Sequence, residues 1–301
     1  MSIVEDIIRL KEEKNAVILA HYYVDEEVQD IADYIGDSFY LSKVATKTDA
    51  DRIIFCGVEF MGESAKILNP DKRVFMPDAT ADCPMAHMAT GEEIEKVKDQ
   101  YEDVAVVCYI NSTAELKTMA DVCVTSSNAV KIVRKLPNEN IFFIPDRNLG
   151  SYVAEQVPEK NIILNAGCCP RHVAITTDKV KEAKAAHPNA LFAAHPECTK
   201  DVLVQADYIG STSGIIDYVV NTNHDAFIIG TVDGVFAEIK KQAPGKKLYT
   251  VKDQQVCVNM KKVTLEKVLD VLAHDTNEVF VEKNLAEKSM KPLQKMLELG
   301  Q

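Results

Sequence analysis

Three cysteines recur at nearly equal spacing, and this recurrence limits the possible folds more than any other feature. Cys83, Cys169 and Cys257 each follow a short apolar run, and they lie 86 and 88 residues apart (169 − 83 and 257 − 169). A fixed spacing along a chain is typical of repeated structural units that pack against one another. The sequence therefore predicts three copies of one unit, with one cysteine at the same place in each.

A second set of markers keeps the same period. Ala-Asp pairs occur at 32–33, 120–121 and 206–207, again 88 and 86 residues apart (120 − 32 and 206 − 120). A polar residue stands eleven positions before each alanine, and a hydroxyl residue stands five positions after each aspartate. These residues are His21, Tyr109 and His195 before the pairs, and Ser38, Ser126 and Thr212 after them. The markers divide the chain into repeats 1–88, 89–175 and 176–301, the last with additional C-terminal helices.

Each copy alternates apolar strands with helices. The runs 16–20, 104–108 and 190–194 are continuously apolar, as buried parallel strands are. Further elements are expected as a helix over 26–34 and a strand over 278–281. Such alternation predicts an α/β fold of three α/β/α (Rossmann-like parallel-sheet) domains around a pseudo-threefold axis. Because ligands bind beyond the carboxyl ends of parallel strands, the three sheets should face one central cavity.

Composition excludes several classes of protein. The net charge of −12 argues against a nucleic-acid partner. No apolar run approaches the roughly 20 residues of a membrane span, and the acidic start of the chain is unlike a signal peptide. Eight cysteines in such a chain predict a cytoplasmic protein with reduced thiols rather than disulfides.

Three thiolates that converge on one cavity indicate a metal or cluster site. A single free cysteine often only packs, which suits the cysteines inside the apolar strands. Zinc sites usually add a histidine or a closely spaced fourth cysteine, and no C-x2-C pair is present. Iron–sulfur clusters are held by thiolates, and three protein ligands leave one iron free as a Lewis acid. We therefore predict Cys83, Cys169 and Cys257 as iron–sulfur ligands, with a redox sensor or carrier and a three-Cys zinc hydrolase as alternatives.

Polar residues that follow the first strand of each copy are candidates for acid–base chemistry. His21 and His195 are of the type that titrates near neutral pH, so either they transfer protons or they only bond a backbone carbonyl. Tyr23 and Tyr109 either relay a proton or line a pocket rim. Glu197 is either a base or one member of an ion pair.

The hydroxyl residues Ser38, Ser126 and Thr212 stand where a helix is expected to begin in each copy. At a helix N-terminus, the hydroxyl and the free backbone N–H groups can hold a carboxylate or a phosphate. An ordinary N-cap uses the same residue types. The sequence leaves both roles open.

Longer motifs along nearly the whole chain carry a resemblance to a known family. They are His21-Tyr22-Tyr23, Gln29-Asp30-Ile31-Ala32-Asp33, Asp82-Cys83-Pro84-Met85, Tyr109-Ile110-Asn111-Ser112, Pro145-Asp146-Arg147-Asn148-Leu149-Gly150, Cys169-Pro170-Arg171-His172, His195-Pro196-Glu197-Cys198, Gly210-Ser211-Thr212 and Cys257-Val258-Asn259-Met260. In these residues the chain resembles the quinolinate synthases, the A protein of bacterial and archaeal NAD biosynthesis.

The resemblance implies a transferase- or dehydratase-type synthase with a [4Fe–4S] cluster on Cys83, Cys169 and Cys257. It implies condensation of iminoaspartate with dihydroxyacetone phosphate to quinolinate, with loss of phosphate and two waters. L-Aspartate oxidase or aspartate dehydrogenase would supply the iminoaspartate. The implied pocket residues are His21, Tyr23, Ser38, Tyr109, Asn111, Ser126, His195, Glu197 and Thr212.

Two cysteines are adjacent in the middle copy, and the repeat register chooses between them. Cys169 lies 49 residues after Ala120 (169 − 120), close to the 51 residues between Ala32 and Cys83 (83 − 32), whereas Cys168 lies 48 residues after it (168 − 120). The Cys-Pro step shared with Cys83 also favours Cys169, because proline helps to set the loop. We predict Cys169 as the ligand.

Overall fold

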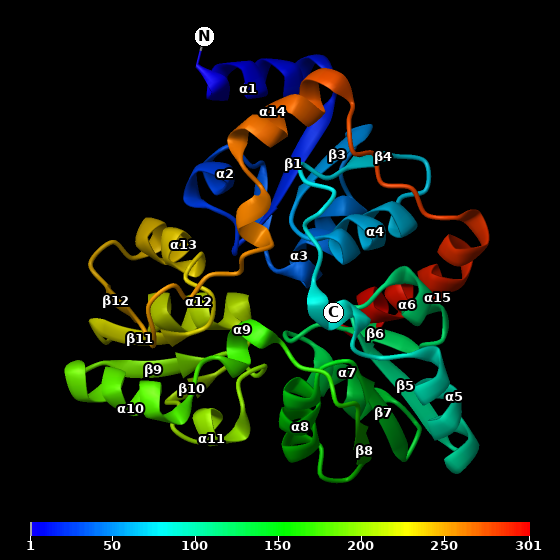
Figure 1. Ribbon diagram of the computed structural model, residues 1–301, viewed down its shortest axis with the longest axis vertical. Helices are drawn as coiled ribbons and strands as arrows, with labels where there is room; N and C mark the ends of the chain where they lie inside the picture. Colours follow the sequence, from blue (N-terminus) through cyan, green and yellow to red (C-terminus); the bar gives the residue numbers. More distant parts are fainter. Residues whose placement is uncertain (1) are drawn as a thin grey trace.

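Three parallel four-stranded sheets surround the centre of the molecule (Figure 1). The structure is a computed structural model that describes residues 2–301. The strand orders are β2-β1-β3-β4, β6-β5-β7-β8 and β10-β9-β11-β12, so each sheet uses its strands in the same order. The predicted fold of three repeated α/β domains is confirmed.

The elements of each repeat follow in chain order. The first contains α1 (Ile3–Glu13), β1 (Ala16–His21), α2 (Glu26–Asp30), β2 (Tyr34–Gly36), α3 (Ser38–Ala45), β3 (Arg52–Cys56), α4 (Glu59–Leu68), β4 (Arg73–Phe75) and the 3-10 turn η1 (Pro84–His87). The second contains α5 (Gly91–Gln100), β5 (Val104–Tyr109), α6 (Ala114–Thr118), β6 (Val122–Val124), α7 (Ala129–Lys135), β7 (Asn140–Ile144), α8 (Arg147–Gln156), β8 (Asn161–Leu164) and α9 (Pro170–Val173). The third contains α10 (Thr177–Ala186), β9 (Leu191–Ala194), α11 (Lys200–Leu203), β10 (Tyr208–Ile209), α12 (Thr212–Asn221), β11 (Ala226–Gly230), α13 (Val235–Gln242), β12 (Lys247–Thr250) and η2 (Met260–Lys262), followed by α14 (Leu265–His274) and α15 (Lys283–Leu299).

The repeated Ala-Asp pair has a structural reason. In each copy the aspartate carboxylate accepts a backbone N–H from the first strand, just before the short edge strand begins. These bonds join Ile18 to Asp33 (2.9 Å), Val106 to Asp121 (2.7 Å) and Phe192 to Asp207 (2.7 Å). The aspartate therefore fixes the start of the edge strand beside the first strand of each sheet.

Two expected elements are wrong. The helix predicted over 26–34 ends at Asp30, and Tyr34–Gly36 forms edge strand β2. This strand and its equivalents β6 and β10 have three residues or fewer, which is too short to give a period-two pattern. The strand predicted over 278–281 is absent from the described residues, where Glu278 makes only an isolated antiparallel bridge to Phe75. Without further strand partners this segment stays a loop, and the side chain of Phe280 is 86% exposed.

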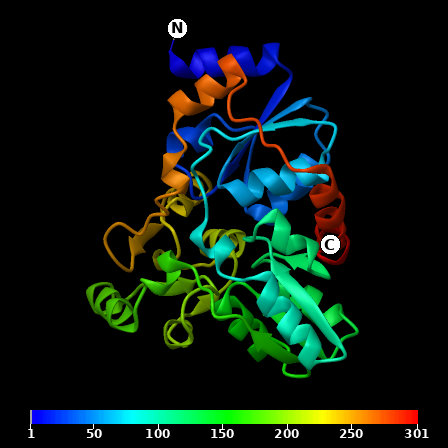
Figure 2. The same cartoon turned by 45° about the vertical axis from the view of Figure 1, so that its right-hand side comes forward.

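The C-terminal helices close the ring of repeats. Thr264 caps α14 as Ser2, Thr90 and Thr176 cap α1, α5 and α10, so α14 is the first helix of a fourth, incomplete copy. It packs against α1, and α15 packs against α4 and α6, where Figure 2 shows it in red between the first and second repeats. The three cysteine loops are thus the connections from each last strand to the next first helix.

Within residues 2–301, no helix combines the length and the apolar character that crossing a bilayer requires.

Candidate active site

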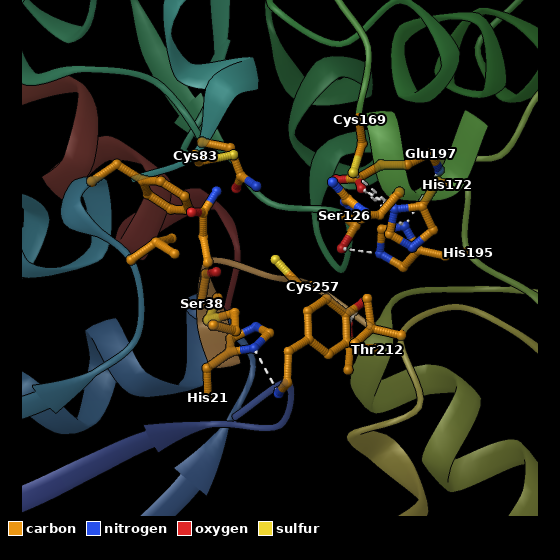
Figure 3. A pocket seen from close by; sticks show the side chains of 18 of the residues that line it. His21, Ser38, Cys83, Ser126, Cys169, His172, His195, Glu197, Thr212 and Cys257 are labelled. Atoms are coloured by element: carbon orange, nitrogen blue, oxygen red, sulfur yellow. Dashed lines mark hydrogen bonds and ion pairs between the residues drawn. The ribbon is translucent and has the colours of Figure 1, made fainter. Parts of the chain in front are cut away.

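A cavity lies where the carboxyl ends of the three sheets meet. The space between its atoms is about 870 Å³, part of it open to solvent. Its lining includes every residue that the sequence analysis assigned to the site: His21, Tyr23, Ser38, Cys83, Tyr109, Asn111, Ser126, Cys169, His195, Glu197, Thr212 and Cys257. The predicted convergence of the three repeats on one cavity is therefore found in the structure (Figure 3).

Three thiols enter the cavity from three loops. The sulfurs of Cys83, Cys169 and Cys257 are directed toward the space between them (Figure 3), and none forms a disulfide. Burial raises the pKa of Cys83 to about 12, against the opposing effect of the backbone N–H groups of Met85 and Ala86. Burial likewise raises the pKa of Cys169 well above its usual range. Such thiols become thiolates only beside a strong positive charge, so this donor set fits a metal or cluster.

Cys168 does not line the cavity among the residues described in 2–301. Its backbone N–H lies 3.4 Å from the sulfur of Met88, on the preceding loop. The neighbouring residue Cys169 is the N-cap of α9, and Pro170 is the first residue of this helix. The structure therefore places Cys169, and not Cys168, at the cavity.

His172 belongs to the site, although the sequence analysis did not assign it a role. Its Nδ1 lies 2.6 Å from Oε2 of Glu197 and 3.2 Å from Sγ of Cys169, and its Nε2 lies 2.9 Å from the hydroxyl of Thr231. Ligand atoms of Cys169, His172 and Glu197 all lie within 4.8 Å of one another, so they form a second possible metal-binding group. The available signal was the spacing of three residues, which places Cys169 and His172 on one side of a helical turn.

Glu197 is a buried carboxylate with several donors around it. Burial alone would raise its pKa, but His172, His195 and the Tyr109 hydroxyl together bring the pKa well below its usual range. The Tyr109 hydroxyl donates to Oε1 of Glu197 at 2.6 Å. Because burial and Glu197 raise the pKa of Tyr109, the phenol keeps its proton and Glu197 is the acceptor of this pair.

His21 and His195 are neutral at pH 7. Burial lowers the pKa of His21 and of His195 to about 3, partly opposed by Glu197. In each ring Nδ1 accepts a backbone N–H two residues on, from Tyr23 at 3.1 Å and from Glu197 at 3.3 Å. The proton therefore resides on Nε2, which makes each ring a hydrogen-bond donor there.

Hydroxyl groups complete the wall. Ser38 and Thr212 are the first residues of α3 and α12, while Asp37 and Ser211 are the N-caps, so the ordinary N-cap role is wrong for these two. Ser126 precedes α7 by a turn, and its hydroxyl lies 3.2 Å from Nε2 of His195.

Tyr23 reaches from the first repeat into the third. Its hydroxyl lies 2.9 Å from that of Thr212 and 2.6 Å from that of Thr231. Burial raises the pKa of Tyr23 above its usual range, so the phenol is a proton donor rather than a phenolate.

Asn111 lines the same cavity with a buried carbonyl oxygen, Oδ1, that has no hydrogen-bond partner within residues 2–301. A buried polar atom without a partner is costly, typically by about 1–3 kcal/mol. An N–H or O–H group of a bound molecule would satisfy it.

The neutral His21 predicts a loss of stability in acid. Its folded-state pKa of about 3 lies below the value of about 6.5 in an unfolded chain, so the unfolded state binds the proton first as the pH falls. The free energy of unfolding should be insensitive to His21 above pH 6.5 and should fall by about 1.4 kcal/mol per pH unit below it. Urea unfolding of the chain and of His21→Gln at pH 7.5 and 5.5 measures this. The pH effect should be smaller by about 1.4 kcal/mol in the variant; an equal effect would contradict the assignment.

Comparison with known proteins gives a consistent result. A family model described as quinolinate synthetase A protein matches residues 5–298. A quinolinate synthase of Caldicellulosiruptor bescii is 52% identical over 295 residues, which cover 98% of this chain and 97% of the relative. One of Fusobacterium nucleatum is 55% identical over 292 residues, covering 97% of each chain. One of Clostridium perfringens is 46% identical over 300 residues, covering 100% of each.

Proposed function

The chain belongs to the quinolinate synthetase A family and is an enzyme of quinolinate formation, and we propose that it condenses iminoaspartate with dihydroxyacetone phosphate in the central cavity. The reaction releases phosphate and two waters and serves NAD biosynthesis. Family membership supports this function over the alternatives of an iron–sulfur carrier or a zinc hydrolase. The observation that carries the proposal is the cavity itself, where thiols, proton donors and a carboxylate from three repeats converge.

We propose that Cys83, Cys169 and Cys257 hold a [4Fe–4S] cluster. The donor set supports this, because three half-buried thiols from three separate loops offer soft ligands. When bound, the cluster would supply one iron without a protein ligand, able to act as a Lewis acid toward substrate oxygens. The competing group of Cys169, His172 and Glu197 has one thiol and fits such a cluster less well.

Proton transfer falls to the pair of Tyr109 and Glu197. The Tyr109 hydroxyl donates to a carboxylate that His172 also contacts, so the phenol is the proton donor of this buried group and the carboxylate orients it. Isomerisation, Schiff-base formation and ring closure all require protons to be removed and returned. The Tyr23 hydroxyl is a further donor at the junction of the first and third repeats.

The substrates carry two carboxylates and a phosphate, and the wall offers neutral donors for them. Nε2–H of His21 and His195 and the hydroxyls of Ser38, Ser126 and Thr212 all line the cavity. Asn111 adds an acceptor for the imine N–H or a substrate hydroxyl.

Product analysis tests the function. The anaerobically purified chain, reconstituted with iron and sulfide, should convert the two substrates together into quinolinate and phosphate in equal amounts. Omission of either substrate should give no quinolinate. Phosphate release without quinolinate would contradict the proposed reaction.

Three further expectations stay proposals. We propose that the chain acts in the cytoplasm, that L-aspartate oxidase or aspartate dehydrogenase supplies its iminoaspartate, and that the repeats divide at 88 and 175. The last is supported by the equivalent caps Thr90 and Thr176, which open the first helices of the second and third repeats.

A further inference from the structure

A fully buried lysine stands behind the wall of the cavity. Lys117, on α6, is 0% exposed. Its Nζ donates to the carbonyl oxygen of Ser112 at 2.5 Å and lies 5.6 Å from the centre of the Phe60 ring. Lysine is almost never fully buried unless its charge is paired. Here the neighbours are a carbonyl, an aromatic face and the buried thiols of Cys108 and Cys123, and no carboxylate within residues 2–301 forms an ion pair with it. Burial of a lysine ammonium costs free energy of folding, so a role for Lys117 in function is worth seeking.

The first repeat makes the same bond with a different residue. Gln29 stands three positions before Ala32, as Lys117 stands three positions before Ala120. It is 1% exposed, and its Nε2 donates at 3.0 Å to the carbonyl oxygen of Val24, the residue equivalent to Ser112 (112 − 88). In two repeats, therefore, a buried donor on the helix after the first strand holds the loop that ends this strand.

In the third repeat, the strand-end loop is bonded by a residue of the neighbouring repeat. Its equivalent position is Leu203, which has no side-chain donor. Its strand-end loop is instead held by Asn148 of the second repeat, whose Nδ2 donates to the carbonyl oxygen of Glu197 at 2.9 Å. Asn148 is 7% exposed.

These contacts occur at the junctions between repeats. Besides Val24, Gln29 donates to the carbonyl oxygen of Gly234 in the third repeat at 3.1 Å, and Lys117 lies over Phe60 of the first repeat. Phe60, Asn148 and Gly234 are equivalent positions, 88 and 86 residues apart (148 − 60 and 234 − 148). At each junction, therefore, the residue at this position contacts either a strand-end loop, as Asn148 does, or the side chain that bonds such a loop, as Phe60 and Gly234 do.

The three loops carry the side chains of the proposed chemistry. Tyr23, Asn111 and Glu197 occupy equivalent positions in them, 88 and 86 residues apart (111 − 23 and 197 − 111), and all three line the cavity. We propose that Gln29, Lys117 and Asn148 are positioning residues that fix these loops across the repeat junctions and so aim Tyr23, Asn111 and Glu197. The inference rests on the proposed function, and it adds residues that do not act on the substrate themselves. A displacement of about 1 Å in such side chains costs on the order of a hundredfold in rate.

The same repeat contains a matched control at the other end of its sheet. Nζ of Lys160 donates to the carbonyl oxygens of Leu136 and Asn138, both at 2.6 Å. Lys160 stands directly before β8, at the amino ends of the strands and away from the cavity. Removing its ammonium breaks bonds of the same kind without touching the strand-end loops.

The experiment compares Lys117→Met with Lys160→Met as cluster-loaded holoenzymes. Iron content, thermal unfolding, kcat and KM for dihydroxyacetone phosphate are measured alongside the wild type. Lys117→Met should lower kcat at least tenfold while its iron content and KM change less than twofold, and Lys117→Arg should recover part of the loss. Lys160→Met should lower the Tm and leave kcat within twofold of the wild type.

The outcomes separate the inference from the function. A wild type that makes no quinolinate would contradict the proposed function. An active wild type with equal kcat values in the two methionine variants would overturn the positioning role. Should Lys117→Met fail to fold, Asn148→Ala takes its place against the same control. A tenfold lower kcat then supports the inference, and an unchanged kcat overturns it.

Discussion

Replacement of Cys169 by alanine is expected to remove both the iron–sulfur cluster and all quinolinate formation, whereas replacement of Cys168 should preserve both. Cys169 lines the cavity, while Cys168 lies outside the described lining and its backbone N–H faces Met88. A cluster that loses one of three thiolates is left with two protein ligands from two loops. Iron content, acid-labile sulfide and quinolinate yield, all measured anaerobically on both variants, test this expectation.

The reverse pattern has a definite meaning. Loss of the cluster from Cys168→Ala with retention in Cys169→Ala would show that the register of the middle repeat is wrong by one residue. Loss from both variants would contradict a single ligand in each repeat. Cys56→Ala, at a cysteine buried within β3, is the control and should keep the cluster.

Replacement of Glu197 by glutamine is expected to lower turnover by about 10²- to 10⁴-fold, which is the usual contribution of a positioned acid or base. The amide keeps the size of the side chain and can still accept from Tyr109, but it lacks the negative charge of the carboxylate beside Tyr109 and His172. Melting temperature and iron content should change little. Steady-state kinetics on the reconstituted variant measure the effect.

An exposed glutamate provides the matched control. Glu155 pairs with Lys200 at 2.6 Å on the surface, so Glu155→Gln removes an ion pair of the kind that contributes little to stability. It should turn over at the wild-type rate. Glu197→Gln with near-normal turnover, or with normal specific activity but an unfolded majority, would assign Glu197 to folding instead of catalysis.

Sequence periodicity was sufficient to predict three repeated α/β units and their common cavity, because the markers recur at the same three-dimensional positions. The equal spacing alone predicted that three cysteines lie close together: Cys83, Cys169 and Cys257. The edge strands β2, β6 and β10 could not be predicted, since two or three residues carry no pattern and their pairing depends on the first strand of each sheet.

Electrostatic properties were the least predictable part of the site. The neutral state of His21 and His195 follows from complete burial, which the sequence does not reveal. The contact of His172 with Glu197 joins two repeats and has no local signal. The equivalence of Gln29 and Lys117 is visible in the register, yet their shared role depends on a backbone carbonyl that only the folded chain presents.

The dependence of turnover on cluster content shows whether the cavity works through an iron–sulfur cluster. Anaerobic samples of one preparation, loaded with increasing amounts of iron and sulfide, are assayed for quinolinate formation and for bound iron. We expect a rate of quinolinate formation that rises in proportion to the content of [4Fe–4S] cluster, and no quinolinate formation by the iron-free chain. Full turnover by iron-free or zinc-loaded protein would contradict it.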